Sequence, residues 1–387
     1  MQYSCDCHHK PGRRTRTIRS AITANHIVEW LRPKTPQTRR HMEGHEIAFA
    51  CVSMALLILG VSSLFFKPAD VLGGGGRKLV FPEGANVGLV FARPSSEPSD
   101  GKWVSAKEGW QYLGEARGRI EVPAHTDLMI RVRQRDLSFL QPMGFDAFSM
   151  LDCSGVGLTD EDTVYLKYAT ELRALNLSQN PALSDRCLAH LASHGKMTWL
   201  NVDQTGISGG LVSANALARM EDLLYFSAND THFEDKGMAH LGECAKLKVL
   251  LLANSQLSIS GVRFLSGFVQ LEVLNLEGSP VEAGAVDCLL GLPRLRHLNL
   301  SGIRISDRDL LGLPNLHELQ YLNLDRTRIT DGSLPIILEC ERLQLVTVRE
   351  TGITLAAISE NPLGRVPRII HARSEHQTTR HLAAIEG

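Results

Sequence analysis

The chain has 387 residues, of which 43% are hydrophobic and 21% charged, and this composition excludes a wholly disordered protein. Lys and Arg number 41 against 42 Asp and Glu, giving a formal net charge of −1. A nucleic-acid-binding protein would concentrate basic residues on one face, so we expect no nucleic acid partner. The apolar content is sufficient for a sizeable core.

Residues 1–46 form a basic segment, with nine Lys and Arg against four acidic residues. We expect this segment to be disordered. Cys5, Cys7, His8 and His9 are zinc-type ligands, but four donors within five residues cannot readily surround one tetrahedral ion. The sequence therefore predicts no metal site here.

Residues 47–66 form a run of 20 residues without a charged side chain. At ~1.5 Å rise per residue this run reaches ~30 Å, the thickness of the hydrocarbon layer of a membrane. Because basic residues concentrate before it, we predict a single-pass signal anchor with a cytoplasmic N-terminus and an extracytoplasmic remainder. A cleaved signal peptide is the alternative, and translation starting at Met42 rather than Met1 would remove most of the orientation signal.

A glycine-rich tether, residues 67–76, follows the predicted membrane span. Residues 77–135 then contain two similar segments, 79–91 and 120–132, each with alternating apolar residues on both sides of a turn that contains proline. This pattern predicts a small β module made of two β-hairpins, with Trp103 and Trp110 in its core. Residues 136–147 are expected to form the N-terminal cap of the array that follows.

The phrase RLRHLNLSGIRISD at residues 294–307 recurs 24 residues later as ELQYLNLDRTRITD. Aligning such phrases on the second leucine of L-x-x-L-x-L gives nine units within residues 148–360, and residues 361–387 are left as a C-terminal cap and tail. The aligned positions, 24 to 26 residues apart, are Leu151, Leu175, Leu200, Leu224, Leu250, Leu274, Leu298, Leu322 and Val346.

This pattern resembles the leucine-rich repeat family, and the 24-residue period is similar to that of a bacterial class related to the cysteine-containing repeats of F-box proteins. The resemblance implies an α/β solenoid with parallel strands on a concave face and short helices outside. The chain departs from the family pattern at the asparagine of the turn, which this alignment finds only at Asn180 and Asn229.

Within a unit, Ser or Thr follows the apolar residue that closes the turn, and this hydroxyl is expected to cap a short helix. An Asp often comes next, where a negative charge suits the start of a helix. Five cysteines fall in the repeats at different phases of the unit. They are too far apart to pair, so free buried thiols are expected at Cys153, Cys187, Cys244, Cys288 and Cys340.

Side chains that alternate with the core leucines point to the concave face. Trp199, Leu223, Tyr225, Val249 and Leu251 are predicted to gather on adjacent strands, and such an apolar cluster with aromatic residues favours protein binding. The alternatives are that these residues only favour strands, or that the β module covers them. The full set of predicted partner-binding residues is Trp199, Asp203, Leu223, Tyr225, Leu251, Glu277, His297, Tyr321, Asp325 and Arg349.

The sequence contains no phosphate-binding glycine loop, zinc-protease helix, nucleophile elbow or paired Cys-x-x-Cys. We therefore expect no catalytic residues, no cofactor and no metal. The sequence favours a non-enzymatic, membrane-anchored scaffold that binds a protein partner. The alternatives are a cytosolic adaptor of the F-box type and an unrecognised enzyme that uses the β module.

Overall fold

The computed structural model describes residues 77–95, 110–143, 147–210, 216–282, 284–360 and 368–371. The chain divides into two compact units, Met1–Leu64 and Phe65–Gly387, and all the described residues belong to the second unit. The predicted basic segment, membrane span and tether, residues 1–76, lie outside the described residues, as do Trp103 and most of residues 361–387. A search of the described part found no helix with the length and apolar character needed to cross a membrane.

The β module is made of five strands whose pairing differs from the predicted hairpins: β1 (Arg77–Val80), β2 (Gly88–Pro94), β3 (Gln111–Glu115), β4 (Arg119–Val122) and β5 (Thr126–Val132). The two similar segments pair with each other, since β1 lies antiparallel to β4 and β2 lies antiparallel to β5. The hairpin prediction was wrong because each segment lacks a tight two-residue turn and finds its complementary edge in the other copy.

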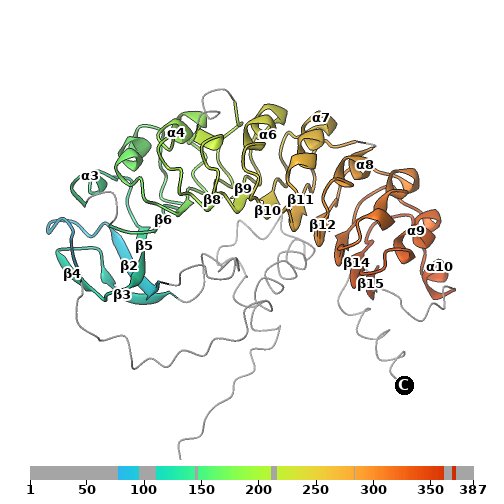
Figure 1. Ribbon diagram of the computed structural model, residues 1–387, viewed down its shortest axis with the longest axis horizontal. Coiled ribbons are helices and arrows are strands. Elements are labelled where there is room, and N and C mark those ends of the chain that lie inside the picture. The colour runs from blue at the N-terminus through green and yellow to red at the C-terminus, as the bar shows by residue number, and fades with distance from the viewer. Residues whose placement is uncertain are drawn as a thin grey trace, which may run out of the picture. The chain divides into compact units, whose positions relative to one another are not determined.

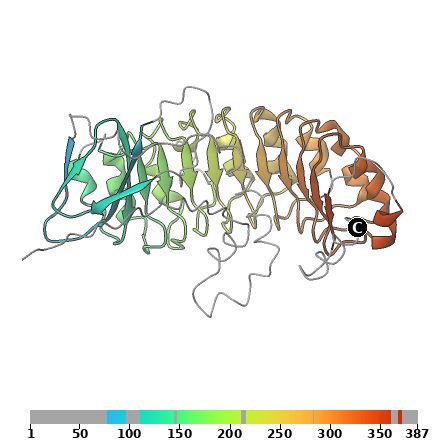
Figure 2. The same ribbon diagram turned by 90° about the horizontal axis from the view of Figure 1, so that it is seen from below.

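The repeats form a parallel sheet of three-residue strands, which Figures 1 and 2 show side by side along the inner face. In the described part, β5 pairs in parallel with the first of these strands, so one sheet of thirteen strands runs in the order β15 to β5, then β2 and β3. The repeat strands are β6 (Met150–Asp152), β7 (Ala174–Asn176), β8 (Trp199–Asn201), β9 (Tyr225–Ser227), β10 (Val249–Leu251), β11 (Val273–Asn275), β12 (His297–Asn299), β13 (Tyr321–Asn323), β14 (Leu345–Thr347) and β15 (Arg368–Ile370).

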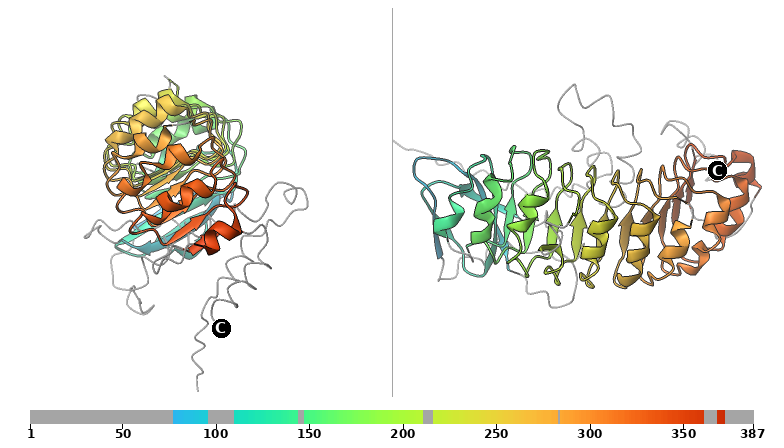
Figure 3. Two further views of the ribbon diagram at one scale, coloured as in Figure 1. Left: turned by 90° about the vertical axis from the view of Figure 1, so that its right-hand side faces the viewer. Right: turned by 90° about the horizontal axis from the view of Figure 1, so that it is seen from above.

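Short helices cover the opposite, outer face of the sheet (Figure 3). The α-helices are α3 (Leu140–Met143), α4 (Asp185–Ala189), α6 (Asp235–Leu241), α7 (Ile259–Val262), α8 (Ala285–Leu289), α9 (Leu334–Leu338) and α10 (Leu355–Ser359). The 3₁₀ helices are η2 (Asp162–Tyr168), η3 (Arg263–Gly267), η4 (Asp307–Leu310), η5 (Leu313–Asn315) and η6 (Asp331–Ser333). Parallel strands inside and short helices outside make this unit a leucine-rich repeat solenoid, as predicted.

A single hydrophobic core runs from the β module through every repeat, from Leu79 to Ile353. The leucines of successive strands share this core, which confirms the central expectation for stacked coils of equal length. The predicted cap contributes Leu137, Phe139 and Leu140 to the same core, while β5 covers the strand edge of the first repeat.

The register of the fourth repeat differs from the predicted alignment. Leu200 pairs with Phe226 and Phe226 with Leu250, so Phe226 occupies the position that the alignment gave to Leu224. Leu223 lies in the core, and its N–H donates to the carbonyl of Met220. In the next repeat the N–H of Leu247 donates to the carbonyl of Cys244 in the same way, so Leu223 and Leu247 are equivalent. The turn position thus holds Thr231 instead of Asn229, and the hydroxyl of Thr231 donates to the carbonyl of Ala228 at 2.6 Å.

Each repeat turns away from the concave face through one residue in the left-handed region, with φ between 52° and 72°. This conformation costs an L-residue other than glycine roughly 1 kcal/mol, so the turn must be held by other bonds. The position falls four residues after the central apolar residue of the strand and holds Gly155, Gln179, Gln204, Asp230, Asn254, Gly278, Gly302, Arg326 and Glu350.

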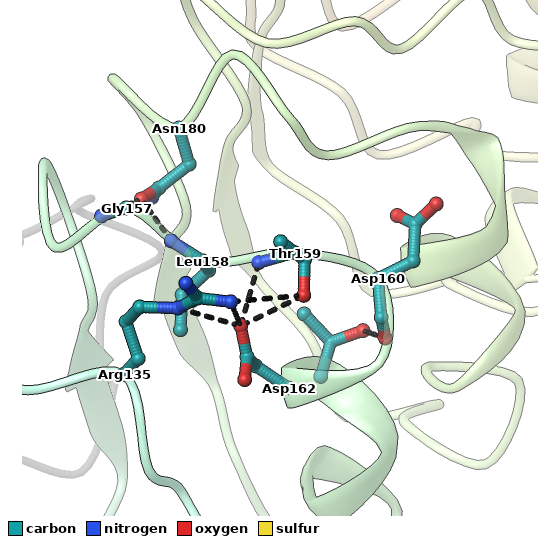
Figure 4. A network of polar contacts seen from close by, with 8 residues as sticks. Arg135, Gly157, Leu158, Thr159, Asp160, Asp162 and Asn180 are labelled. Carbon is teal, nitrogen blue, oxygen red and sulfur yellow. Dashed lines mark hydrogen bonds and ion pairs between the residues drawn. The ribbon is translucent and has the colours of Figure 1, made fainter.

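Asn180 holds the turn between the first two repeats, as Figure 4 shows. Its Oδ1 accepts the N–H groups of Gly157 and Leu158 at 2.8 and 2.9 Å. Its Nδ2 donates to the carbonyls of Cys153 and Leu177, both at 2.9 Å. In two other repeats the equivalent residue is Thr205 or Thr327, whose hydroxyl donates to one carbonyl of its own turn. Of these three residues, only Asn180 bridges two repeats.

The predicted helix caps are present at Ser184, Ser258, Thr330 and Thr354, whose side chains accept an N–H of the following helix. Five Asp residues near the starts of the outer helices bond the next repeat. Each accepts the N–H and the hydroxyl of a Ser or Thr there, as Asp160 does from Ser184 at 2.8 and 2.5 Å. The same pair of bonds joins Asp185 to Ser208, Asp235 to Ser258, Asp307 to Thr330 and Asp331 to Thr354.

A second set of bonds between repeats joins side chains four residues before the central apolar residue of each strand. These residues bond in successive pairs at 2.5 to 2.7 Å: Glu171 with Lys196, Asp222 with Lys246, Gln270 with Arg294, and Glu318 with Arg342. The acid or amide always belongs to the earlier repeat of the pair.

Candidate functional site: the concave face

One row of side chains crosses the concave face of the whole sheet, because the strand register is continuous. Tyr112 of β3 pairs with Phe91 of β2, Phe91 with Met129 of β5, and Met129 with Met150 of β6. From Met150 the concave row, the name used below, continues through Ala174, Trp199, Tyr225, Val249, Val273, His297, Tyr321 and Leu345 to Arg368. The row is apolar or aromatic over most of its length.

From Met129 to Trp199 the concave row is buried, whereas Tyr112 at its start is 57% exposed. Met129, Met150, Ala174 and Trp199 form a second apolar cluster, separate from the main core, against which Phe91, Trp110 and Tyr225 pack. The rings of Trp199 and Tyr225 are stacked, with centroids 4.9 Å apart and planes inclined by 15°. Trp199 is only 4% exposed, so this half is a packed layer instead of an open platform.

Two arginines of the β module border this cluster. The guanidinium of Arg93 lies 4.5 Å from the ring centroid of Trp110, a cation–π contact, so Trp110 belongs to the concave side and not to the predicted module core. Arg131 lies 5.7 Å from the ring of Phe91 and pairs with Asp152 at 2.9 Å. The β module therefore covers part of the concave face, which is one of the alternatives that the sequence left open.

The corrected fourth repeat changes two predicted site residues. Leu223 is fully buried in the main core, so its placement on the concave face was wrong. Tyr225 takes the place in the row that was given to Leu223, and Ser227 takes the place that was given to Tyr225. Leu251 stays on the concave side as predicted, half-buried on β10.

In the C-terminal half the concave row is more accessible. His297 and Tyr321 are stacked at 4.6 Å with planes inclined by 4°, and both are half-buried. The hydroxyl of Tyr321 donates to Gln344 at 2.9 Å. Burial, and secondarily the charge of Arg296, lowers the pKa of His297 to about 4, so the stacked pair is uncharged at neutral pH.

The charged residues predicted for the site lie in a neighbouring column, at the ends of the strands. Glu277 accepts bonds from Arg326 and, at 3.0 Å, from Asn299. Asp325 accepts the N–H of Arg349 at 2.7 Å, and burial raises its pKa although that bond and the arginine charge oppose the shift. The C-terminal half therefore presents bonded charges beside an aromatic pair.

Asp203 is the corresponding acid of the N-terminal half. It accepts the hydroxyl of Ser227 at 2.6 Å and the N–H of Asn229 at 2.7 Å. Burial raises the pKa of Asp203, and these bonds only partly oppose the shift. Its bonds to the next repeat make Asp203 a structural residue of the turn.

The asparagines beside the concave row are also structural. In five repeats the Oδ1 atom accepts the N–H two residues later, at 2.8 to 3.1 Å, and so holds the end of the strand. These residues are Asn176, Asn201, Asn275, Asn299 and Asn323. In the C-terminal half, the side chains that can contact a partner are therefore those of the concave row and the hydrogen-bonded charged residues beside it.

The cysteines of the described residues are all free thiols. Cys153, Cys187, Cys244 and Cys340 are buried free thiols, as predicted, and Cys288 is half-buried and free. Burial raises the pKa of Cys153 well above its ordinary value, with the charge of Asp152 adding to the shift. Among the described residues no three His, Cys, Asp or Glu side chains gather as a metal site requires.

The sequence analysis missed Phe91, Tyr112 and Arg326. Phe91 and Tyr112 belong to strands assigned to a separate module, and only the parallel pairing of β5 with β6 extends the row to them. The signal present in the sequence was the apolar alternation of residues 126–132, which matches that of a repeat strand. Arg326 occupies a left-handed turn position, and no pattern in the sequence points its side chain toward Glu277.

Comparisons with known proteins give likenesses of fold only. No protein-family model and no curated protein matches the sequence. An internalin of Listeria monocytogenes is 21% identical, with a TM-score of 0.49, over 61% of this chain and 71% of its own. An internalin C2 of the same species is 18% identical, with a TM-score of 0.43, over 55% of this chain and 84% of its own.

A third similar structure is the leucine-rich repeat ectodomain of the membrane receptor kinase GASSHO1/SCHENGEN3 of Arabidopsis thaliana, in complex with Casparian strip integrity factor 2. It is 16% identical, with a TM-score of 0.43 over 62% of this chain, and the match spans 28% of that ectodomain. The repeat assignment of this protein rests on its own strand register and continuous core.

Proposed function

We propose that this protein is a non-enzymatic scaffold that binds a protein partner through the C-terminal half of the concave face. The observation that carries the proposal is the accessible stacked pair of His297 and Tyr321 on a continuous sheet, beside the bonded charges of Glu277 and Arg326. Aromatic residues and arginines supply most of the binding energy at protein interfaces, and curved repeat arrays commonly use their inner face.

The partner-binding surface of this proposal is smaller than the predicted set. It contains the row residues of β12 and β13, Leu251 of β10 and the neighbouring charged residues, and it excludes Leu223 and Trp199, which are buried. The residues proposed to contact the partner are Leu251, Glu277, His297, Tyr321, Asp325, Arg326 and Arg349.

We further propose that the array is held at a membrane and lies outside the cytoplasm. The uncharged run at residues 47–66 and the basic residues before it support this arrangement. Extraction of membranes at alkaline pH should leave the full chain in the pellet, and protease added to intact cells should digest a tag at the C-terminus. A soluble chain, or a tag cleaved only after lysis, would contradict the proposed arrangement.

The binding surface is tested by placing a photoreactive phenylalanine analogue at Tyr321, and separately at Leu311, in the full chain in cells. Leu311, which follows η4, is 67% exposed and therefore gives a control of high accessibility away from the strands. We expect a discrete crosslinked protein from position 321 and none from position 311. The same product from both positions, or from position 311 only, would rule out the concave surface.

Once that protein is identified, its affinity should fall at least tenfold for Tyr321→Ala and stay unchanged for Leu311→Ala. A loss of this size is typical of one aromatic residue at the centre of an interface, where ~1.4 kcal/mol is a factor of ten. Unchanged binding by Tyr321→Ala would show that the partner contacts another part of the molecule.

A further inference from the structure

His194 occupies a position that the other repeats fill with apolar side chains. The backbone carbonyl of His194, which lies six residues before Leu200, accepts the N–H of Met197 at 3.0 Å. The same bond recurs at the same distance from the central apolar residue in eight successive units. The shared backbone bond shows that the eight positions are structurally equivalent. Their side chains, all buried, are Ala169, His194, Met220, Cys244, Phe268, Leu292, Leu316 and Cys340.

The imidazole of His194 is fully buried, and neither ring nitrogen has a hydrogen-bond partner among the described residues. The carbonyls of Leu166, Ala169 and Leu191 lie near enough to favour the protonated ring, but burial outweighs them and lowers the pKa. Leu166 and Ala169 belong to the first repeat, and His194 belongs to the second. The ring therefore lies at the joint between these two repeats.

Among the described residues, no charged side chain contributes to the lowered pKa of His194. On η2, Lys167 is exposed and lies 5.1 Å from the ring of Tyr168. At the C-cap of α4, His190 bonds Thr163 at 3.0 Å, and on the neighbouring edge Lys196 pairs with Glu171. None of these groups contributes to the pKa shift of His194, so a proton taken up there would meet no counter-charge.

We propose that His194 is a pH-sensitive joint: mild acid favours an opened state in which this ring is exposed and protonated, and so loosens the contact between the first two repeats. Each repeat of a stacked array contacts only its neighbours, so the loss of stability should concentrate in the first repeats and the β module. The later repeats carry apolar side chains at the equivalent position, so acid-dependent loosening there is assigned to His297, whose pKa is also lowered, and not to this joint.

The sign of the effect follows from proton linkage. An unfolded histidine has a pKa near 6.5, and the folded one lies below it, so between the two values the unfolded chain binds more protons. Stability therefore falls as the pH falls from about 6.5 to the folded pKa, and His194 adds no further change below that value. In this window the unfolding equilibrium constant should rise by up to about tenfold per pH unit.

The test compares the purified full chain with His194→Met, the residue that the next repeat carries at this position, and with His317→Met, an exposed control. Equilibrium unfolding is followed at intervals from pH 8 to pH 5. We expect His194→Met to reduce the acid-dependent loss in this window and His317→Met to leave it unchanged. Because the pKa values of His190 and His297 are also lowered, His190→Gln and His297→Gln measure the shares of these two residues separately.

Two measurements on chains that retain His194 keep the proposal open to refutation if His194→Met does not fold. Hydrogen exchange of the His297→Gln variant at pH 5.5 should show faster opening of β6 to β8 than at pH 7, after correction for intrinsic rates, with β11 to β14 unchanged. An NMR titration of the His194 ring should give a pKa below 6.5. Uniform acid loosening along the array, or a ring that titrates at 6.5 or above, would overturn the proposal.

Discussion

The two halves of the concave face have the same strands and the same register, and they differ in what their row of side chains touches. In the N-terminal half, Trp199 stacks on Tyr225, and Phe91 and Trp110 from the β module region pack on the apolar cluster that contains Trp199. In the C-terminal half, the stack of His297 on Tyr321 is accessible and lies beside bonded charges. The backbone period fixes where a side chain points, and the neighbours decide whether it is core or surface.

The largest expected effect tests the corrected register that defines the N-terminal half. Leu223→Ala should reduce the free energy of unfolding by about 2–5 kcal/mol, because it removes a fully buried leucine from the main core. Leu224→Ala, one residue later and half-buried, should cost less than about 1 kcal/mol. Urea unfolding measures both. The opposite ranking would restore Leu224 to the core and return Leu223 to the concave face.

The comparison itself is tested by removing one aromatic residue from each half. Trp199→Ala should reduce the free energy of unfolding by about 3 kcal/mol, because the indole is buried in the second apolar cluster. Tyr321→Ala should reduce it by less than about 1 kcal/mol, because its ring is only half-buried. Equal losses in thermal or urea unfolding would mean that the two halves are equally packed.

The turns of the two halves should also differ in stability. Asn180→Thr replaces a bridge between two repeats by the single bond seen at Thr327, and should cost about 2 kcal/mol because buried backbone groups lose their partners. Thr327→Val removes one bond and should cost about 1 kcal/mol. A larger loss from Thr327→Val would show that the second repeat does not depend on its asparagine.

The smallest expected effect concerns the bonds along the edge of the array. Glu318→Gln weakens a pair with Arg342 in the C-terminal half, and Glu171→Gln weakens the pair with Lys196 in the N-terminal half. Both pairs are partly exposed, so each change should cost less than about 1 kcal/mol, and high salt should shrink the loss. A loss that does not depend on salt would point to packing in place of charge.

The fold of the repeats was predictable because nine copies of one apolar pattern leave little freedom for another register. The fourth repeat was the exception, because its register was predicted wrongly. Phe226 and Ala228 occupy positions where most other units have branched aliphatic residues, and the two leucines that precede them drew the alignment to Leu224. The similarity of Val202–Thr205 to Ala228–Thr231 around the turn was the signal that would have placed it correctly.

The candidate site was less predictable than the fold. The sequence fixes which residues point to the concave face, and His297, Tyr321 and Leu251 lie there as expected. It does not reveal that a distant segment covers part of that face, because the packing of Phe91 and Trp110 on the cluster with Trp199 depends on the antiparallel pairing of β2 with β5. That pairing has no local signature in the chain.

The edge bonds between Glu171 and Lys196, Asp222 and Lys246, Gln270 and Arg294, and Glu318 and Arg342 have a consequence for changes in array length. Deleting the second repeat, which contains Lys196, would place Glu171 beside Asp222, two like charges, whereas deleting the second and third together would place Glu171 beside Lys246. Growth or shrinkage of this solenoid in steps of two coils therefore preserves its charge pairing, and steps of one coil do not.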